Sequence, residues 1–249
     1  MPQFSDDLYL GPALGPNPGF GSDGNPAPMS QGVGPMARDY LWDIVPLALV
    51  ANNLATAQAV AAAGTLTLTA GTGVTRVTLP SGAFGYVLDV PRAVSVTSTN
   101  AGDTTQTATV RGVDQYNQPM TESITFNGAA TVNGKKAFKR VDSITISAAL
   151  TGNGSAGTTN IFGLPYRVTD RGYLDPSWNN TLARDAATVV VADTTSPATA
   201  TTGDVRGTLV PSSAADGSKR LIVSIGLPGI ASGPNATRAG AFGVTQYAG

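Results

Sequence analysis

The chain has 249 residues, no Cys, no His and a single Glu, Glu122, and only 12% of its residues are charged, about half the usual share. Without Cys and His it has no Ser-His or Cys-His nucleophile system, no Cys/His zinc site and no disulfide framework. Its net charge of −1 argues against a dedicated nucleic-acid binder, because phosphate contacts require an excess of Lys and Arg on one face.

The N-terminus carries neither the basic stretch nor the apolar stretch of a signal peptide. The most apolar window, residues 41–51, contains Asp43 and Pro46 and is far too short to cross a membrane. We therefore expect a soluble chain that is made in the cytoplasm and has no membrane partner.

The composition changes abruptly near residue 46. The first 46 residues hold eight of the seventeen prolines, seven glycines and no threonine, whereas the rest of the chain holds 31 threonines. Pro removes an amide donor and Gly raises the entropy cost of order, so residues 11–19, GPALGPNPG, can form neither a helix nor a central strand. We predict an extended Pro/Gly-rich arm over residues 1–45 and a β domain over residues 46–249, with two β subdomains divided near residues 165–185 as an alternative.

Apolar and aromatic side chains recur along the arm, although a flexible linker would have little use for them. Extended like polyproline, 40 residues reach on the order of 120 Å, well beyond a single domain. We expect these side chains to anchor the arm on neighbouring chains, with attachment to its own domain as the alternative. The candidate anchors are Phe4, Leu8, Tyr9, Leu10, Phe20, Tyr40 and Trp42.

Beyond the arm, apolar residues recur with a period of two. Short β-branched runs separated by turn residues are typical of antiparallel sheets. The runs are residues 65–69, 74–79, 94–97, 107–111, 122–126, 143–147, 188–191 and 220–225. The sequence therefore predicts a mainly β fold, an antiparallel β-sandwich of jelly-roll or immunoglobulin-like type. Residues 54–63 are Ala-rich; we predict a loop or irregular strand there, with one or two helical turns as the alternative.

No catalytic, cofactor-binding or metal-binding residue is predicted. The aspartates of the β domain stand at expected turns and strand ends, where the side chain accepts hydrogen bonds from local amides. Loop Asp and Asn side chains also allow a calcium site, but no Asp-x-Asp-x-Asp spacing supports one. Residues 152–157 match Gly-x-Gly-x-x-Gly without the βαβ context of a nucleotide site, so we expect a turn. The basic residues Lys135, Lys136, Lys139 and Arg140 are expected on a solvated strand or turn.

Several segments together resemble a family of tailed-phage virion structural proteins. Residues 87–98 read VLDVPRAVSVTS, similar to LDVPR-x-V-x-V-T-S, and residues 110–125 read VRGVDQYNQPMTESIT, similar to G-x-D-x-Y-G-N-P-x-T-E-T-I-T. The segments GKKAF (134–138), FGLPYRV (162–168), TGDVRGT (202–208) and PSSAADG (211–217) follow in the same order. One departure is Asn117-Gln118 in place of the usual Gly-Asn, which leaves the turn type open.

The resemblance implies a head decoration, or cement, protein: a non-enzymatic subunit on the capsid exterior. Its implied partners are the major capsid protein and further copies of itself, as a trimer or, alternatively, a dimer. Two other functions stay open from the sequence, a tail or head–tail connector subunit and a module that binds host-surface glycans.

Overall fold

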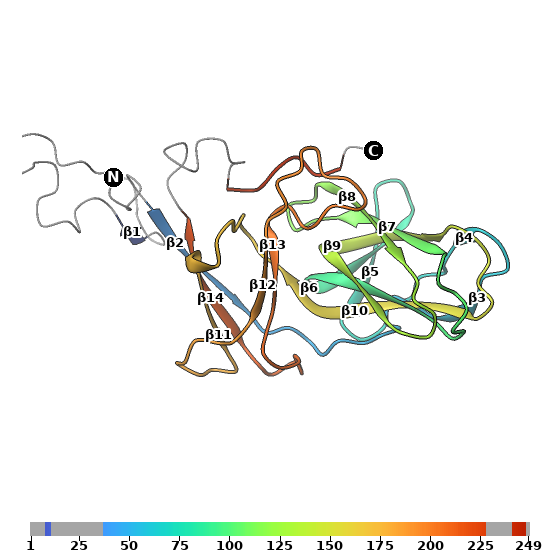
Figure 1. The fold of residues 1–249 in the computed structure, drawn as a ribbon, viewed down its shortest axis with the longest axis horizontal. Coiled ribbons are helices and arrows are strands. Elements are labelled where there is room, and N and C mark those ends of the chain that lie inside the picture. The colour runs from blue at the N-terminus through green and yellow to red at the C-terminus, as the bar shows by residue number, and fades with distance from the viewer. Residues whose placement is uncertain (1–7, 11–36, 228–240, 248–249) are drawn as a thin grey trace, which may run out of the picture.

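The computed structural model describes residues 8–10, 37–227 and 241–247, whose regular structure is almost entirely β (Figure 1). In chain order the strands are β1 (Leu8–Leu10), β2 (Ala37–Ile44), β3 (Ala55–Ala59), β4 (Gly64–Thr65), β5 (Val74–Thr78), β6 (Phe84–Ser98), β7 (Thr107–Val113), β8 (Pro119–Thr125), β9 (Val132–Ile146), β10 (Asn153–Gly163), β11 (Leu174–Trp178), β12 (Thr188–Val191), β13 (Gly207–Val210) and β14 (Leu221–Leu227). A short 3-10 helix, η2 (Arg171–Tyr173), precedes β11. The expected antiparallel, sandwich-like β fold is confirmed.

The larger sheet has ten strands and encloses the first core cluster. Its order is β12-β13-β10-β6-β9-β7-β8, with β3 added to β10, β4 to β9 and β5 to β6. The long strands β6 and β9 curl, so that the sheet wraps around its own apolar face (Figure 1). The first core cluster is formed by side chains such as Leu54, Leu88, Val94, Val96, Val110, Phe126, Phe138, Ile144 and Ile146.

The smaller sheet joins strands from opposite ends of the chain, in the order β1-β2-β14-β11. β2 pairs with β14 over seven residues, from Ile44 opposite Leu221 to Arg38 opposite Leu227. Residues 37–44, which we expected in the arm, therefore form a strand of this sheet. The rest of the expected arm, residues 1–7 and 11–36, lies outside the described residues.

A second core cluster lies behind the smaller sheet. Its buried side chains include Trp42, Val90, Phe162, Leu164, Trp178, Val189, Leu209, Leu221, Val223 and Ile225. Val90, Phe162, Val189 and Leu209 come from strands of the ten-stranded sheet. The two core clusters share strands β6 and β10, and the second already includes Phe162 and Leu164, so the division near residues 165–185 stays a prediction.

Tertiary contacts determine the structure of three local segments. Within the Ala-rich segment the predicted irregular strand is confirmed, because residues 55–59 pair with β10 as β3 with a shift of register, and burial of Leu54 and Ala55 outweighs helix propensity. In the run 65–69 only Thr65 lies in a strand, β4, and the Gln58 side chain takes the place of a partner strand by bonding the N–H and C=O of Thr67.

The third segment is the glycine-rich run 152–157. It does not form the expected turn but opens β10. A Cβ on Gly157 would lie 2.0 Å from the Val50 carbonyl oxygen, and the amide of Thr158 donates to that oxygen at 2.9 Å. Glycine is required here because the chain after β2 passes directly over the strand.

The LDVPR segment forms an irregularity in the middle of β6. The pairing of β6 with β9 shifts register between Val87 and Arg92, which accommodates Pro91 because that residue has no amide to donate. Arg92 is buried and pairs with Asp89 at 2.7 Å, and both side chains also hydrogen-bond to the backbone of Leu47. The motif thereby fastens the chain after β2 to the ten-stranded sheet.

Candidate functional site

The strongest candidate site lies where four segments distant in the sequence meet. Asp114, in the β7–β8 turn, is fully buried; its Oδ1 accepts the amides of Tyr116 and Gln118 at 2.8 and 2.9 Å. Its Oδ2 pairs with Nη1 of buried Arg206 at 3.0 Å and accepts the side-chain amide of Gln246 at 3.4 Å. One carboxylate thus holds its own turn, the segment before β13 and the C-terminal segment together.

The turn itself explains the departure from the resembled motif. Asn117 has φ of 61°, the left-handed conformation that glycine adopts most readily. Among other residues, Asn tolerates this conformation best because its short polar side chain bonds locally. Asn117 can therefore stand where the resembled motif has glycine, with the backbone in the left-handed conformation that a glycine would adopt.

An aromatic row crosses this site from β2 to the β7–β8 turn. Its ring centroids are 4.7 Å apart for Tyr40 and Tyr166, 5.8 Å for Tyr166 and Phe242, and 5.0 Å for Phe242 and Tyr116. The Tyr116 hydroxyl donates to the Pro165 carbonyl at 2.7 Å. The row connects the smaller sheet to the far end of the ten-stranded one.

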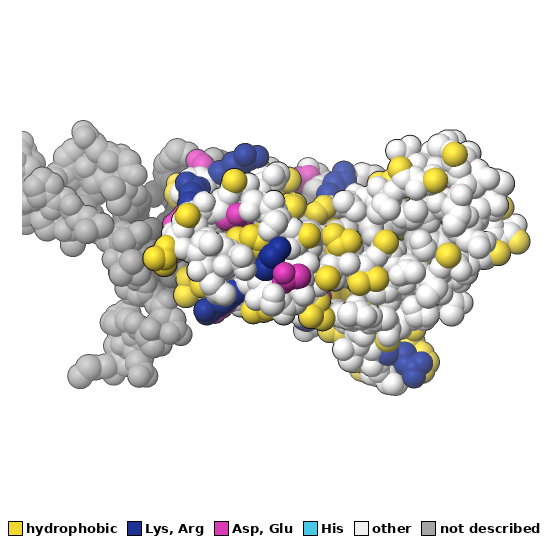
Figure 2. All heavy atoms as spheres, turned by 90° about the horizontal axis from the view of Figure 1, so that it is seen from below, with side chains coloured by type: hydrophobic (Ala, Val, Ile, Leu, Met, Phe, Trp, Pro, Cys, Tyr) yellow, Lys and Arg dark blue, Asp and Glu magenta, His cyan; other side chains and the backbone are white. Residues whose placement is uncertain are grey.

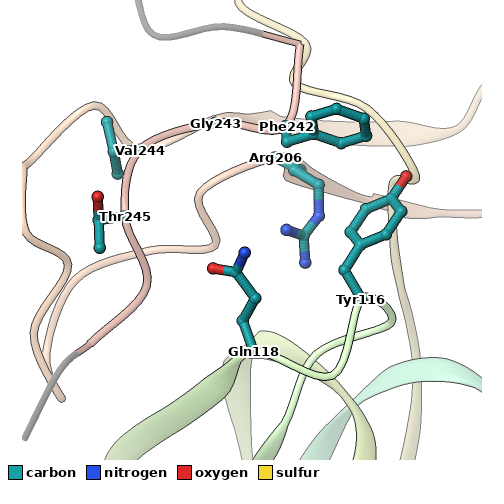
Figure 3. Close-up of a pocket in the computed structure, with 7 residues that line it drawn as sticks. All are labelled: Tyr116, Gln118, Arg206, Phe242, Gly243, Val244 and Thr245. Carbon is teal, nitrogen blue, oxygen red and sulfur yellow. The ribbon is translucent and has the colours of Figure 1, made fainter.

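A hollow of about 470 Å³ opens beside the row, lined by Tyr116, Gln118, Arg206, Phe242, Gly243, Val244 and Thr245 (Figure 3). Its volume lies within the range of small-molecule sites. The rings of Tyr116 and Phe242 are 39% and 56% exposed, and the Arg206 guanidinium points between Gln118 and Tyr116 (Figure 3). Because Asp114 balances the charge of Arg206, the hollow suits an uncharged ligand group with an apolar face.

A cluster of buried charges lies on β8 and β9, the two strands that flank β7. Glu122 is 1% exposed, and its carboxylate accepts the amides of Lys135 and Lys136 at 2.6 and 3.3 Å. Burial raises the pKa of Glu122 to about 7, although those two amides and the two lysine charges act in the opposite direction. A Cβ on Gly134 would lie 2.5 Å from Glu122 Oε2, so glycine leaves the space that the carboxylate occupies.

Residues 193–204, here called the cover segment, lie over this cluster. The Lys135 ammonium donates to the Thr201 carbonyl at 2.7 Å and the Lys136 ammonium donates to that of Thr199. Asp204, which closes the segment, accepts the Ala137 amide at 3.0 Å. At the segment's outer side, the Ala198 amide donates to the carbonyl of Thr245, a wall of the hollow, at 3.1 Å.

The basic cluster is not the solvated strand that we expected. Lys136 is fully buried, Lys139 donates to the Leu88 and Asp89 carbonyls, and Arg140 pairs with Asp142. The reason is position, since Lys136 shares the inward face of β9 with Gly134 and Phe138. The expected local role is confirmed for Asp114, Asp193 and Asp216, which accept amides two residues further along the chain. Asp103 instead accepts the distant amides of Thr151 and Gly152.

The predicted anchors fall into three groups. Phe4 and Phe20 lie outside the described residues, and Leu8, Tyr9 and Leu10 form β1. Tyr40 joins the aromatic row, and Trp42 is buried in the second core cluster. Trp42 therefore anchors β2 to the chain's own body rather than to a neighbouring chain.

The sequence did not single out Arg206, Phe242 or the pairing of Glu122 with Lys136. Glu122 carried a usable signal, because it is the only Glu in the chain and lies inside a β-branched run. No sequence signal indicated that residues 114–118 contact Arg206 and the C-terminal segment, because those contacts depend on the fold.

Among the residues described, no group of three or more Asp or Glu side chains is placed to hold a metal ion. Over the same residues, no helix is long and apolar enough to span a membrane. Comparisons with protein-family models, with curated proteins and with solved structures found no match for this chain.

Proposed function

We propose that the chain is a non-enzymatic subunit of a tailed-phage virion, a decoration or cement protein that binds the outside of the assembled head shell. Its partners in this proposal are the major capsid protein and other copies of itself. It stabilises the shell against the pressure of the packaged DNA.

The observation that carries this proposal is the convergence of the resembling segments. Gln115 and Tyr116 of one segment both donate to Pro165 of another, at 3.0 and 2.7 Å. Ala137, within GKKAF, donates to Asp204 of TGDVRGT, while Arg206 of that segment pairs with Asp114. Segments that define a common scaffold are expected to contact one another, so this network supports a shared fold as the basis of the resemblance.

The surface is also suited to burial against other chains. On the face seen in Figure 2, charged side chains are few and apolar ones are spread among uncharged polar groups. Depletion of charge is typical of the buried part of interfaces. Several apolar side chains are strongly exposed in the described part of the chain, among them Leu41, Val45, Leu49 and Leu182.

The physical mechanism is mass action combined with multivalency. A subunit that binds only the assembled shell stabilises that state over its dissociated parts. Many weak sites acting on one shell then add to a large resistance.

The deciding experiment compares virions that carry the protein with virions that lack it. The released DNA is measured on heating and on EDTA treatment, and the undecorated particles are expected to lose DNA earlier. Equal resistance of the two particles would exclude a stabilising role. Copy number distinguishes the connector alternative, because a cement protein is present in hundreds of copies and a connector ring in about a dozen.

The N-terminal segment provides a second test. β2 is held in the smaller sheet, so deletion of residues 1–36 keeps the strand and Trp42 in place. We expect the shortened protein to fold and to lose stable incorporation into particles. Full occupancy of the shortened protein would show that the anchor lies elsewhere.

The hollow beside the aromatic row favours one alternative, a module that binds host-surface glycans. Exposed rings next to an uncharged polar lining suit the apolar face and the hydroxyls of a sugar. A glycan array probed with the wild-type protein and with Phe242→Ala tests this function. Binding that is lost in the variant would favour it over the cement role.

A further inference from the structure

Besides the bond from Ala198 to Thr245, the cover segment is fastened by a set of bonds to β8 and β9. The Ser123 amide donates to the Ala200 carbonyl at 2.8 Å, beside the bonds from the two lysine ammoniums to Thr199 and Thr201. The segment thereby seals Glu122 and Lys136 from solvent. If it lifts away, both charges become hydrated.

The sealed charges do not balance. Facing the Glu122 and Lys136 side chains are Lys135 on β9 and, from the cover segment, Asp193 and Asp204. Arg206, next to Asp204, is paired with Asp114. With every group ionised, the buried side chains here are three carboxylates (Glu122, Asp204 and Asp114) and two cations (Lys136 and Arg206), while Lys135 is exposed and Asp193 is half-buried. An excess buried charge is costly, and uptake of one proton removes it.

We infer that the cover segment is a proton-linked latch, closed when Glu122 is protonated and released when Glu122 ionises. The released segment withdraws Ala198 from Thr245, so the latch also frees one wall of the hollow.

The direction follows from linkage. Burial raises the pKa of Glu122 from 4.5 to about 7, so closure is fully favoured below pH 4.5 and weakens as the pH rises through 7. Burial also raises the pKa of Asp204, which acts in the same direction. Lys136 acts in the opposite direction, because burial lowers its pKa and closure gains as the ammonium loses its proton. Asp193, whose pKa is lowered, affects closure only at acidic pH.

The single Glu of the chain permits a direct measurement. In full-length protein labelled with δ-13C glutamate, Glu122 gives the only titrating glutamate signal. We expect its midpoint near pH 7. A midpoint near 4.5 would overturn the proposal, whatever the behaviour of any variant.

Hydrogen exchange then tests whether the cover segment responds. Between pH 6 and pH 7.5, we expect the protection factors of residues 193–204 to fall about tenfold, while those of β6 stay constant. Constant protection of the segment, or an equal fall in β6, would contradict a local latch.

Two variants distinguish an effect of Glu122 titration from a general weakening of the bonds that hold the cover segment. Glu122→Gln should remove the pH dependence of protection in the segment. Lys135→Gln removes the exposed ammonium that holds Thr201, and should lower protection at every pH while leaving the pH dependence unchanged. If Glu122→Gln fails to fold, the glutamate titration and the wild-type exchange profile still decide. An unchanged pH profile in a folded Glu122→Gln protein would refute the role of this carboxylate.

Discussion

The first core cluster and the site around Asp114 and Glu122 bury side chains of opposite chemistry. The first cluster is made of aliphatic and aromatic side chains of β3 to β10, whose interactions are additive and not directional. The second site buries three carboxylates and two cations, Glu122, Asp204, Asp114, Lys136 and Arg206. An apolar core accepts small changes of shape at moderate cost, whereas a buried polar network loses stability sharply when one member is removed.

Trp42→Ala tests whether β2 belongs to the body of the protein. The ring is buried in the second core cluster, so we expect a loss of about 3–5 kcal/mol in the free energy of unfolding, measured by urea denaturation. Leu41→Ala, on the same strand but 62% exposed, is the control and should change stability by at most about 0.5 kcal/mol. Equal stability of the Trp42 variant and the wild type would mean that the ring serves a neighbouring chain.

Asp114→Asn tests the sharp response of the polar site. The substitution keeps the shape but leaves Arg206 buried without its counter-charge, which costs about 3–5 kcal/mol. Ile144→Val in the first core cluster also changes little volume and should cost only about 0.5–1.5 kcal/mol.

The exposed ion pair of Asp43 with Arg220 supplies a charge control, and Asp43→Asn should cost at most about 1 kcal/mol. Comparable losses for Asp114→Asn and Asp43→Asn would show that burial of the Asp114–Arg206 pair carries no special weight.

The two regions also differ in how far the sequence predicts them. β7 and β8 form a hairpin, and β9 pairs with the other edge of β7, so alternation and turn residues indicate these strands locally. The pairing of β2 with β14 joins residues such as Asp43 and Ile222, and no local pattern encodes a contact over that separation. Because the residues before β2 are rich in Pro and Gly, we expected β2 to be part of the extended arm.

At the candidate site, the alternation of inward and outward residues along β9 already indicated which side chains are buried. Lys136 has the parity of Phe138 and therefore points inward, but its charge suggested a solvated position. What compensates that charge, the cover segment and Glu122, comes from elsewhere in the fold. Without the fold, the sequence does not show that the carbonyls of Thr199 and Thr201 accept hydrogen bonds from the lysine ammoniums.

Gly134→Ala probes the space around the buried carboxylate. The new methyl group would lie 2.5 Å from Glu122 Oε2, and displacing that group should cost about 1–3 kcal/mol. Gly64→Ala is the matched control in a strand, because its nearest atom would be 3.8 Å away. In a double-mutant cycle, Glu122→Ala should relieve most of the cost of Gly134→Ala, and strict additivity of the two would contradict the contact.

Tyr116→Phe makes the smallest change, since it removes one hydroxyl from the junction between the β7–β8 turn and the segment after β10. The Pro165 carbonyl loses the Tyr116 donor but keeps the Gln115 side-chain amide at 3.0 Å, so no acceptor is left unpaired. The expected loss is therefore about 0.5–1.5 kcal/mol in urea denaturation, the net value of one hydrogen bond. Tyr173→Phe is the control: that ring is also 39% exposed, and its hydroxyl has no hydrogen-bond partner within the described residues. If both substitutions cost the same, the Tyr116 hydroxyl does not hold the two segments together, and the Gln115 amide and the aromatic row must do so.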